Sequence, residues 1–270
     1  MTSGTPRTPG TSETYDGFHV ERDTGTGIAT VTLDVPEKMN RVSMAARDQL
    51  AGVFGDLGAD GGVRVIVVGG AGEKAFTAGG DIPGFMARTP EELSHLAKNI
   101  GAAERCPKPV VAKLHGFTFG VGLELALACD LRVAAYDTVL GLPEITLGMI
   151  PGSGGTQRLA HLVGLSRAKD AILRGRRIEA GEAFEWGLVA EVVPLDQLDH
   201  RTTEIALELA AKAPLALKVA KRVLNLAYDA PLHVGLELEG LAYGLLRSTD
   251  DFAEGVAAFA ERRPPKYTGT

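Results

Sequence analysis

Three short apolar segments constrain the fold of this chain more than any other feature of its sequence. They are VRVIVVGG (63–70), KPVVAKLHG (108–116) and DLRVAAYD (130–137). Apolar runs of this length, bounded by turn residues, are typical of buried strands, and each is followed by a loop. Because helical patterns follow in turn, the order strand, loop, helix repeats and predicts an α/β fold with right-handed crossovers.

The helical patterns and one hairpin complete this core. FHVERDTGTGIATVTLD (18–34) alternates about a Gly-rich turn and predicts a β-hairpin. SMAARDQLAGVFGDLGAD (43–60) opens with Ser43 as a cap and predicts a helix. We expect a polar helix around 90–104 and another over GGTQRLAHLVG (154–164). The apolar side chains of the 43–60 helix that share one face are Met44, Leu50, Val53, Phe54 and Leu57.

The chain divides into three parts on these patterns. Residues 1–15 are rich in Ser, Thr, Gly and Pro and predict a disordered tail. Residues 16–195 form the predicted α/β core, and residues 196–270 read as a helical C-terminal region.

Charge and composition exclude several classes of partner. The chain has 28 Lys and Arg against 34 Asp and Glu, a net charge of −6, which argues against nucleic acid or an anionic membrane as the main ligand. No apolar run approaches the roughly 20 residues of a transmembrane helix, and the N-terminus lacks a secretory h-region. We therefore expect a cytoplasmic protein. Its 2 Cys and 6 His show no metal-ligand spacing, so no metal site is predicted.

Glu124 lies in the almost uncharged segment HGFTFGVGLELALACDLRVAA (115–135). A buried carboxylate is costly unless it is paired, hydrogen-bonded or protonated. The helix begins at a Gly-rich loop, whose free N–H groups would suit an oxygen that develops negative charge. Glu124 either caps its own helix or has a chemical role.

Two further loops carry candidate site residues. In FTAGGDI (76–82) two glycines let the backbone approach a ligand, although an ordinary strand-to-helix turn has the same pattern. LPEITLGMIPGSGGTQRL (142–159) is a long irregular segment with Glu144 near its start, which could equally be a surface carboxylate bonded to Arg158. Two backbone-donor loops and two carboxylates are the parts needed to polarise a carbonyl and move a proton at a neighbouring carbon.

These motifs resemble the crotonase (enoyl-CoA hydratase/isomerase) superfamily. The resemblance extends over residues 18–267 and includes RIEAGEAFEWGLVAEVVP (178–195) and DFAEGVAAFAERRPPKY (251–267). It implies a ββα-repeat spiral core, a helical C-terminal trimerisation region, and a homotrimer or a homohexamer built as a dimer of trimers. It also implies an acyl-CoA thioester as substrate, a role in fatty acid metabolism, and no cofactor, because coenzyme A is part of the substrate. Some relatives bind RNA. The net negative charge of this chain and the presence of both glutamates argue against that function.

The resemblance assigns catalytic roles to four positions. The backbone N–H groups of Gly80 and Val121 would form an oxyanion hole for the thioester, and Val121 can serve if its φ is negative. Glu144 would deliver a proton to C2 while Glu124 helps water attack C3. Isomerases of the family typically keep only the glutamate that matches Glu144. Since both are present, the sequence predicts an enoyl-CoA hydratase, with an isomerase or another enolate-forming enzyme as the alternative.

The same resemblance indicates substrate-binding positions. They are Lys38, Met39, Arg41, Ala78, Asp81, Ile82, Phe85, Gly120, Leu142 and Met149. Arg41 replaces a small residue of the family and either reaches a CoA phosphate or points into solvent. The same two alternatives apply to Arg263 and Lys266 near the C-terminus. The acyl-pocket candidates are apolar, which favours a plain short or medium acyl chain or a hydrophobic ring.

Overall fold

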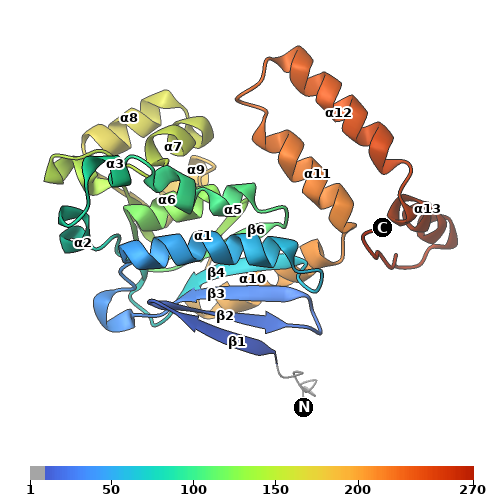
Figure 1. Ribbon diagram of the computed structural model, residues 1–270, viewed down its shortest axis with the longest axis horizontal. Coiled ribbons are helices and arrows are strands. Elements are labelled where there is room, and N and C mark those ends of the chain that lie inside the picture. The colour runs from blue at the N-terminus through green and yellow to red at the C-terminus, as the bar shows by residue number, and fades with distance from the viewer. Residues whose placement is uncertain (1–9) are drawn as a thin grey trace.

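The computed structural model describes residues 10–270 and places their strands in two sheets (Figure 1). The larger sheet has the order β1-β2-β3-β4-β6-β8-β11. Its strands are β1 (Thr11–Tyr15), β2 (Phe18–Asp23), β3 (Ile28–Leu33), β4 (Val65–Gly70), β6 (Val110–Leu114), β8 (Leu131–Ala135) and β11 (Glu191–Val193). β1, β2 and β3 pair antiparallel, whereas the pairs from β3 to β11 are parallel. The predicted hairpin is β2 and β3, and β4, β6 and β8 are the three predicted buried strands.

A second, smaller sheet is built from short strands that follow the central ones. β5 (Ala75–Thr77) follows β4, β7 (Phe117–Phe119) follows β6, and β9 (Val139–Gly141) follows β8, with β10 (Arg177–Glu179) at the edge. β5, β7 and β9 are parallel neighbours. The chain thus repeats two strands and a helical segment, which confirms the ββα spiral. Because the carboxyl ends of parallel strands share one edge, the loops after β5, β7 and β9 converge.

Helices cover both faces of the large sheet. The main core packs β2, β3, β4 and β6 against α1 (Met44–Ala59) and α6 (Val121–Ala128). Ser43 caps α1 as predicted, since its hydroxyl accepts a hydrogen bond from the Ala46 N–H at 3.0 Å. A smaller cluster on the opposite face packs α10 (Leu195–Ala210) against β4, β6 and β8. α10 therefore belongs to the sheet core, although it falls within the predicted C-terminal region.

The remaining helices of the core are short. They are α2 (Ile82–Met86), α3 (Pro90–Leu93), α4 (Leu96–Ile100), α5 (Ala102–Arg105), α7 (Gly155–Val163), α8 (Leu165–Leu173) and α9 (Ala180–Glu185), with 3₁₀ turns η1 (Pro36–Lys38) and η2 (Pro143–Leu147). The single polar helix expected around 90–104 is instead divided into α3, α4 and α5. The helix predicted over 154–164 is α7.

The N-terminal prediction is partly wrong. Residues 1–9 of the predicted tail lie outside the described residues, but Thr11–Tyr15 forms β1 and pairs with β2. The side chains of β1 are almost all exposed. The strand is therefore held mainly through its backbone hydrogen bonds, which a polar sequence makes as readily as an apolar one.

The last three helices stand beside the core rather than on it (Figure 1). They are α11 (Pro214–Asn225), α12 (Leu232–Leu246) and α13 (Asp250–Glu261). Lys221 is the buried residue of α11, where its Nζ lies 2.7 Å from Asp130 Oδ2, and α12 contains no buried residue. Over residues 10–270, none of the helices has the length and apolar character needed to cross a membrane.

Candidate active site

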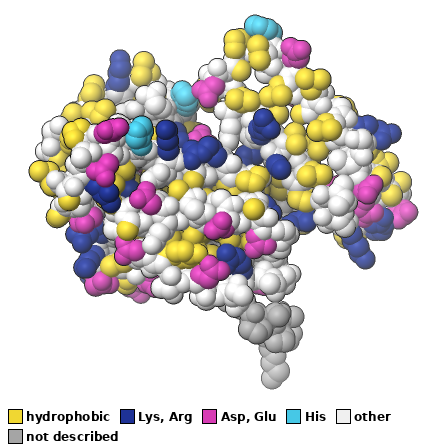
Figure 2. Space-filling model, in the orientation of Figure 1, with side chains coloured by type: hydrophobic (Ala, Val, Ile, Leu, Met, Phe, Trp, Pro, Cys, Tyr) yellow, Lys and Arg dark blue, Asp and Glu magenta, His cyan; other side chains and the backbone are white. Residues whose placement is uncertain are grey.

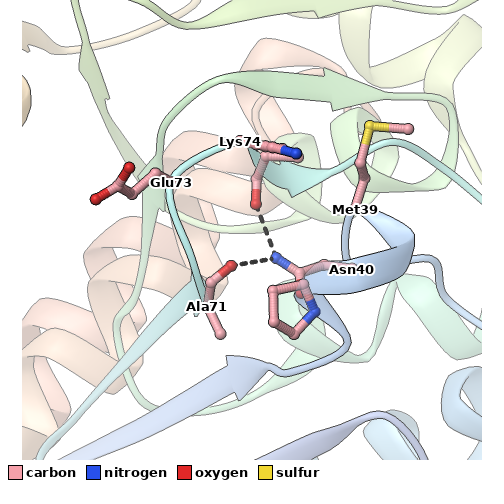
Figure 3. A pocket seen from close by; sticks show the side chains of 7 residues that line it. Met39, Asn40, Ala71, Glu73 and Lys74 are labelled. Carbon is pink, nitrogen blue, oxygen red and sulfur yellow. Dashed lines mark hydrogen bonds between the residues drawn. The ribbon is translucent and has the colours of Figure 1, made fainter.

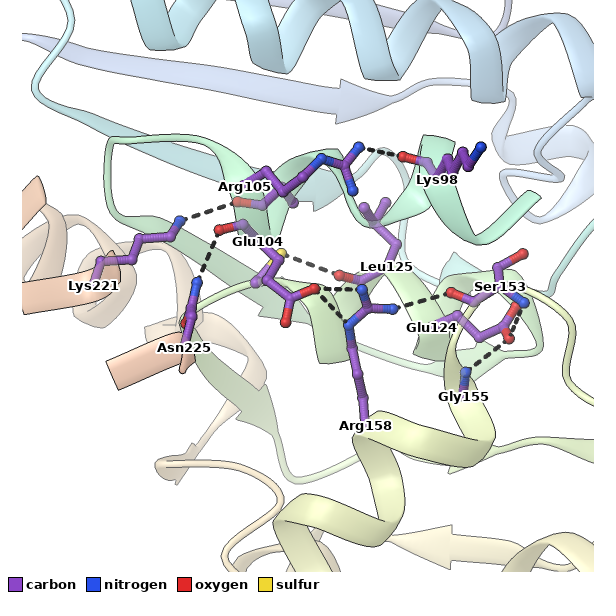
Figure 4. Close-up of polar contacts among 12 residues, drawn as sticks. Lys98, Glu104, Arg105, Glu124, Leu125, Ser153, Gly155, Arg158, Lys221 and Asn225 are labelled. Carbon is purple, nitrogen blue, oxygen red and sulfur yellow. Dashed lines mark hydrogen bonds and ion pairs between the residues drawn. The ribbon is translucent and has the colours of Figure 1, made fainter. Parts of the chain in front are cut away.

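Glu124 is fixed by the backbone of a distant loop. It lies in α6 with its side chain 2% exposed, and its Oε1 accepts hydrogen bonds from the N–H groups of Ser153 at 2.6 Å and Gly155 at 3.0 Å (Figure 4). Among the described residues no side chain caps the start of α6, so Glu124 does not cap its own helix. Two donors on one oxygen orient the carboxylate and leave Oε2 free to contact a substrate or water.

The loop that holds Glu124 is itself anchored by Arg158 of α7. Arg158 Nη1 donates to the Ser153 carbonyl at 3.1 Å, and Arg158 Nε donates to Glu104 Oε2 at 3.1 Å (Figure 4). The expected alternative, a bond between Arg158 and Glu144, is therefore wrong, because Glu104 of α5 takes that place. The chain thus ties α5, α7 and the 153–155 loop together behind Glu124.

Glu144 lies on the opposite side in η2, in different surroundings. Its Oε2 is buried and has no hydrogen-bond partner within residues 10–270. Burial, together with the nearby charge of Glu124, raises the pKa of Glu144 to about 7. A carboxyl group with such a pKa holds its proton in a large fraction of molecules at neutral pH and can act as a general acid.

Glycine 120 brings the two carboxylates to one place. A Cβ atom on Gly120 would lie 3.0 Å from Glu144 Oε1, and the residue has φ 54°, a left-handed conformation that favours glycine. Gly122, two residues later, allows α6 to approach β5, since a Cβ there would lie 2.4 Å from Thr77 Cγ2. These glycines let the start of α6, the end of β5 and η2 meet.

Within residues 10–270, the N–H groups of the two predicted oxyanion-hole residues make no hydrogen bond. Around Gly80, Val42 N–H bonds to the Gly79 carbonyl and Asp81 N–H bonds to the Val42 carbonyl, which leaves the N–H of Gly80 out of the pairing. Val121 is the first residue of α6, where N–H groups lack helical partners. Its φ is not positive, which meets the condition set for a non-glycine residue there. Both residues follow neighbouring parallel strands, β5 and β7.

The segment predicted to bind CoA forms a tight turn beside β5. Met39 and Asn40 adopt positive φ values of 50° and 54°, and Asn40 Nδ2 donates to the carbonyls of Ala71 and Ala75, each at 2.8 Å. Next to this turn is a cavity of about 190 Å³ that Met39 and Lys74 help to line (Figure 3). Lys38 is exposed at the end of η1.

Arg41 lies at the surface, as one of its two expected alternatives has it, and its side chain is 42% exposed. Its Nη1 lies 3.0 Å from Asp81 Oδ1, so it also pairs with another predicted substrate-binding residue. The ion pair links the 36–43 turn to the N-cap of α2. Ala78 reinforces this link, because its N–H donates to the Met39 carbonyl at 2.9 Å. In the C-terminal region Arg263 likewise pairs with Glu254, at 2.6 Å.

The predicted acyl-pocket residues separate into two groups. Leu142 is 1% exposed and packs inside, and Phe85 is half-buried beside Gly80. Ile82 and Met149 are 53% and 58% exposed, so within this chain they lie at the rim.

Sequence reasoning missed one charged residue of the site, Arg47. Its side chain is 3% exposed, and its Nη1 donates to Ser153 Oγ at 3.1 Å. The signal was present, because position 47 lies three residues after Met44 and three before Leu50, on the apolar face of the 43–60 helix. A charged side chain on the buried face of a helix needs a polar or charged partner. This requirement could have identified Arg47 from the sequence.

Within residues 10–270 no group of three His, Cys, Asp or Glu side chains is arranged to hold a metal ion. The site therefore consists of backbone donors, two carboxylates and one guanidinium. This arrangement can polarise a carbonyl oxygen and transfer protons at the adjacent carbons.

Comparisons with known proteins agree with this geometry. The sequence profile described as enoyl-CoA hydratase/isomerase matches residues 23–270. The chain is 35% identical over 240 residues to the short-chain-enoyl-CoA hydratase of Clostridium acetobutylicum, covering 87% of this chain and 92% of that protein. It is 35% identical over 249 residues to the (E)-benzylidenesuccinyl-CoA hydratase of Thauera aromatica, covering 90% and 96%. The crystal structure of an enoyl-CoA hydratase from Bacillus anthracis superposes with a TM-score of 0.86 at 37% identity, covering 97% and 100%.

Proposed function

The chain belongs to the enoyl-CoA hydratase/isomerase family, and we propose that it is a hydratase that adds water reversibly across the C2=C3 bond of a 2-enoyl-CoA thioester. The observation that carries this proposal is the pair of glutamates. Glu124 is held by two backbone N–H groups, and Glu144 faces it with a pKa of about 7. A hydratase needs one carboxylate to orient water and one acid to protonate carbon, and these two surroundings suit those two roles.

Polarisation of the thioester comes first. With its carbonyl oxygen between the N–H groups of Gly80 and Val121, the substrate develops negative charge on that oxygen as water adds. Val121 begins α6, so the positive end of the helix dipole also faces the oxygen. These donors are fixed before the reaction, because β5 and β7 hold them side by side.

Proton transfer then follows from the positions of the carboxylates. Glu124, through its free Oε2, orients a water molecule and takes its proton as the oxygen bonds to C3. Glu144 gives its proton to C2, and the electrons of the C2=C3 bond form the new C–H bond. The net change in the substrate is the addition of H and OH. Glu124 has then gained a proton and Glu144 has lost one, and exchange with solvent returns both to their starting states. The reaction needs no cofactor, since coenzyme A is part of the substrate.

The nucleotide part of CoA is proposed to bind at the 36–43 turn. The turn presents Lys38 and Met39 at the surface beside the cavity of about 190 Å³. The family acts on acyl-CoA thioesters, and the relatives named above differ in acyl group, from short-chain enoyl to benzylidenesuccinyl. Family membership therefore does not determine the acyl group of the substrate.

The C-terminal helices are proposed to pack against neighbouring copies in a homotrimer, or in a hexamer of two trimers. α12 carries apolar side chains that are more than half exposed, namely Leu232, Leu236, Leu241, Tyr243 and Leu245. Figure 2 shows hydrophobic side chains over these helices, and an apolar groove of about 670 Å³ separates α11 from the core. Apolar surface of this extent is typical of an interface.

Sedimentation of the purified protein tests this assembly. We expect trimers or hexamers for the wild type and smaller species for a Leu241→Asp, Tyr243→Asp variant. Leu173, which is 65% exposed on α8, supplies the matched control Leu173→Asp. A monomeric wild type would contradict the proposal.

Hydration itself is tested with crotonyl-CoA, by following the loss of enoyl-thioester absorbance. We expect rapid turnover by the wild type and losses of about 10²–10⁴ in both Glu124→Ala and Glu144→Ala. A Glu124→Ala variant that keeps most of its activity on a β,γ-enoyl-CoA would instead indicate an isomerase.

A further inference from the structure

Arg47 of α1 brings a buried positive charge to the reaction centre. Its side chain is 3% exposed, and the one hydrogen bond of its guanidinium within residues 10–270 runs from Nη1 to the neutral Ser153 Oγ, at 3.1 Å. A guanidinium in a protein keeps its proton, so this charge is permanent. A buried charge is costly unless opposite charges lie near it, and a leucine would fill the same place without that cost.

The opposite charges belong to the two glutamates of the site. Burial lowers the pKa of Arg47, and the negative charges of Glu124 and Glu144, with a smaller contribution from the exposed Asp48, oppose that shift. The influence is mutual, because the positive charge of Arg47 opposes the rise in the pKa of Glu144. The guanidinium therefore has two carboxylates as counter-charges, although its hydrogen bond goes to a hydroxyl group.

On the side of Glu124 the link is Ser153. Its hydroxyl accepts the Arg47 hydrogen bond, and its backbone N–H donates to Glu124 Oε1 at 2.6 Å. Arg158 donates to the Ser153 carbonyl at 3.1 Å and also to Glu104, whose carboxylate balances its charge. The charge of Arg47, in contrast, meets a neutral group at Ser153 and stays available to the glutamates.

On the side of Glu144 the link is the backbone after β5. A Cβ atom on Gly80 would lie 2.8 Å from Arg47 Nη2, so the guanidinium lies against a proposed oxyanion donor. A Cβ atom on Gly120 would lie 3.0 Å from Glu144 Oε1 and 3.8 Å from Gly79 Cα. The 79–80 backbone thus connects the surroundings of Arg47 to those of Glu144.

The proposed reaction moves one negative charge between these two glutamates. Before water adds, Glu124 is the ionised base and Glu144 the protonated acid. Afterwards Glu124 holds a proton and Glu144 is ionised. A direct ion pair with one carboxylate would hold the charge on that residue and oppose its transfer. A fixed cation that is near both carboxylates stabilises the negative charge before and after the transfer.

We infer that Arg47 is a positioning residue of the site, which anchors Ser153 behind Glu124 and supplies the counter-charge that Glu124 and Glu144 share while protons move. The inference rests on the proposed function, because a shared counter-charge is needed when the negative charge passes from one glutamate to the other. Arg47 acts through the two carboxylates, and its role requires no contact with the substrate.

The pH dependence of kcat/KM with crotonyl-CoA tests this role. Arg47→Gln keeps an N–H donor for Ser153 and removes the charge. Without the cation the ionised form of Glu144 is less stable, so the pKa of Glu144 rises. An opposite charge within contact distance lowers the pKa of a carboxyl group by about 1–3 units, and we expect the lower end here because the guanidinium bonds to Ser153.

The fall of kcat/KM that the wild type shows above a pH of about 7 should therefore begin about one unit higher in Arg47→Gln. Its kcat should be about tenfold lower, because the acid is weaker and the charge formed on Glu144 lacks its partner. Arg47→Lys restores the charge and should bring both quantities back toward the wild type. An unchanged pH dependence in Arg47→Gln, or one that Arg47→Lys leaves shifted, would overturn the inference.

A matched control separates the charge from packing. Leu50 lies three residues after Arg47 on the buried side of α1 and is 1% exposed. Leu50→Val should lower the melting temperature and leave the pH dependence unchanged. If Arg47→Gln does not fold, Arg47→Met takes its place with the same expected shift, because an unbranched apolar side chain suits these surroundings.

Infrared spectroscopy distinguishes this inference from the proposed function, because it requires no turnover. The carbonyl stretch of protonated Glu144, identified as the band that Glu144→Gln lacks, disappears as the carboxyl group ionises. A midpoint that rises in Arg47→Gln and returns in Arg47→Lys, in a protein that hydrates no enoyl-CoA, would support the counter-charge and reject the hydratase. Hydration that depends on both glutamates, with the same midpoint in Arg47→Gln as in the wild type, would reject the role of Arg47 and support the hydratase.

Discussion

The two sides of the active site hold their carboxylates in contrasting ways. On one side, the 153–155 loop gives Glu124 two backbone hydrogen bonds, and Arg158 anchors that loop. On the other side, η2 leaves Glu144 Oε2 buried without a partner within the described residues. The first arrangement fixes the orientation of the proposed base, whereas the second favours a protonated acid at Glu144. In the proposed mechanism, two identical side chains would thus take two roles because of their surroundings.

The largest effects should come from neutralising both carboxylates. We expect Glu124→Gln and Glu144→Gln each to lower kcat for crotonyl-CoA by about 10²–10⁴, because each removes one of the two proton-transfer groups. The double variant should lose little more than the worse single variant, since the two residues act on one concerted step. Initial rates for the three variants measure this.

The glutamine at position 124 is a conservative change, because its carbonyl oxygen can still accept both loop hydrogen bonds. Losses that simply add in the double variant would show that the two carboxylates act in separate steps. The contrast between a base and an acid would then need revision.

The next largest loss of activity should come from changes to the proposed oxyanion hole. Val121→Pro removes the proposed N–H donor at the first position of α6, where proline is tolerated. We expect kcat to fall by about 10²–10³. Val121→Ala keeps the N–H and is the matched control, so equal losses in the two variants would mean that the side chain, and not the N–H, matters.

A smaller and graded effect should appear with pH. Burial raises the pKa of Glu144 to about 7, and only its protonated form can give a proton to C2. Hydration measured as kcat/KM should therefore be highest below that pH and fall about tenfold per unit above it. The falling limb should disappear from the residual activity of Glu144→Gln. If kcat/KM of Glu144→Gln still falls at high pH, the ionisation of another group causes that fall.

Much of this architecture could be predicted from local patterns. The strands β4, β6 and β8 and the Ser43 cap of α1 follow from short apolar runs and a capping residue, which are properties of neighbouring residues. The convergence of Gly80, Val121 and Glu144 could not be derived from their spacing. It depends on the parallel pairing of β5, β7 and β9, which joins residues far apart in sequence.

The errors have equally specific causes. β1 was taken as disordered because it is polar, but its backbone pairs with β2, Arg22 Nη1 donates to Glu13 Oε1 at 2.7 Å and Tyr15 stacks on Phe18. Arg47 was not singled out, because a helical pattern shows which face is buried and not what that face contacts. A bond between Arg158 and Glu144 was one alternative, whereas the fold brings Glu104 of α5 to Arg158. Each error concerns a partner that lies far away along the chain.

The smallest effect should be seen in stability, and it follows from the same contrast. The folded state keeps a proton on Glu144 up to a pH of about 7, whereas the unfolded chain releases it near 4.3. The protonated carboxyl therefore contributes stability below the unfolded pKa, and that contribution is lost as the pH rises through the folded pKa. Glutamine, which does not ionise, avoids the loss. We expect the Tm of Glu144→Gln to rise relative to that of the wild type by about 5–10 °C between pH 5 and pH 8. The exposed Glu185→Gln should show no such trend. A difference between Glu144→Gln and the wild type that stays constant over this range would mean that Glu144 ionises in the folded protein as it does in the unfolded chain.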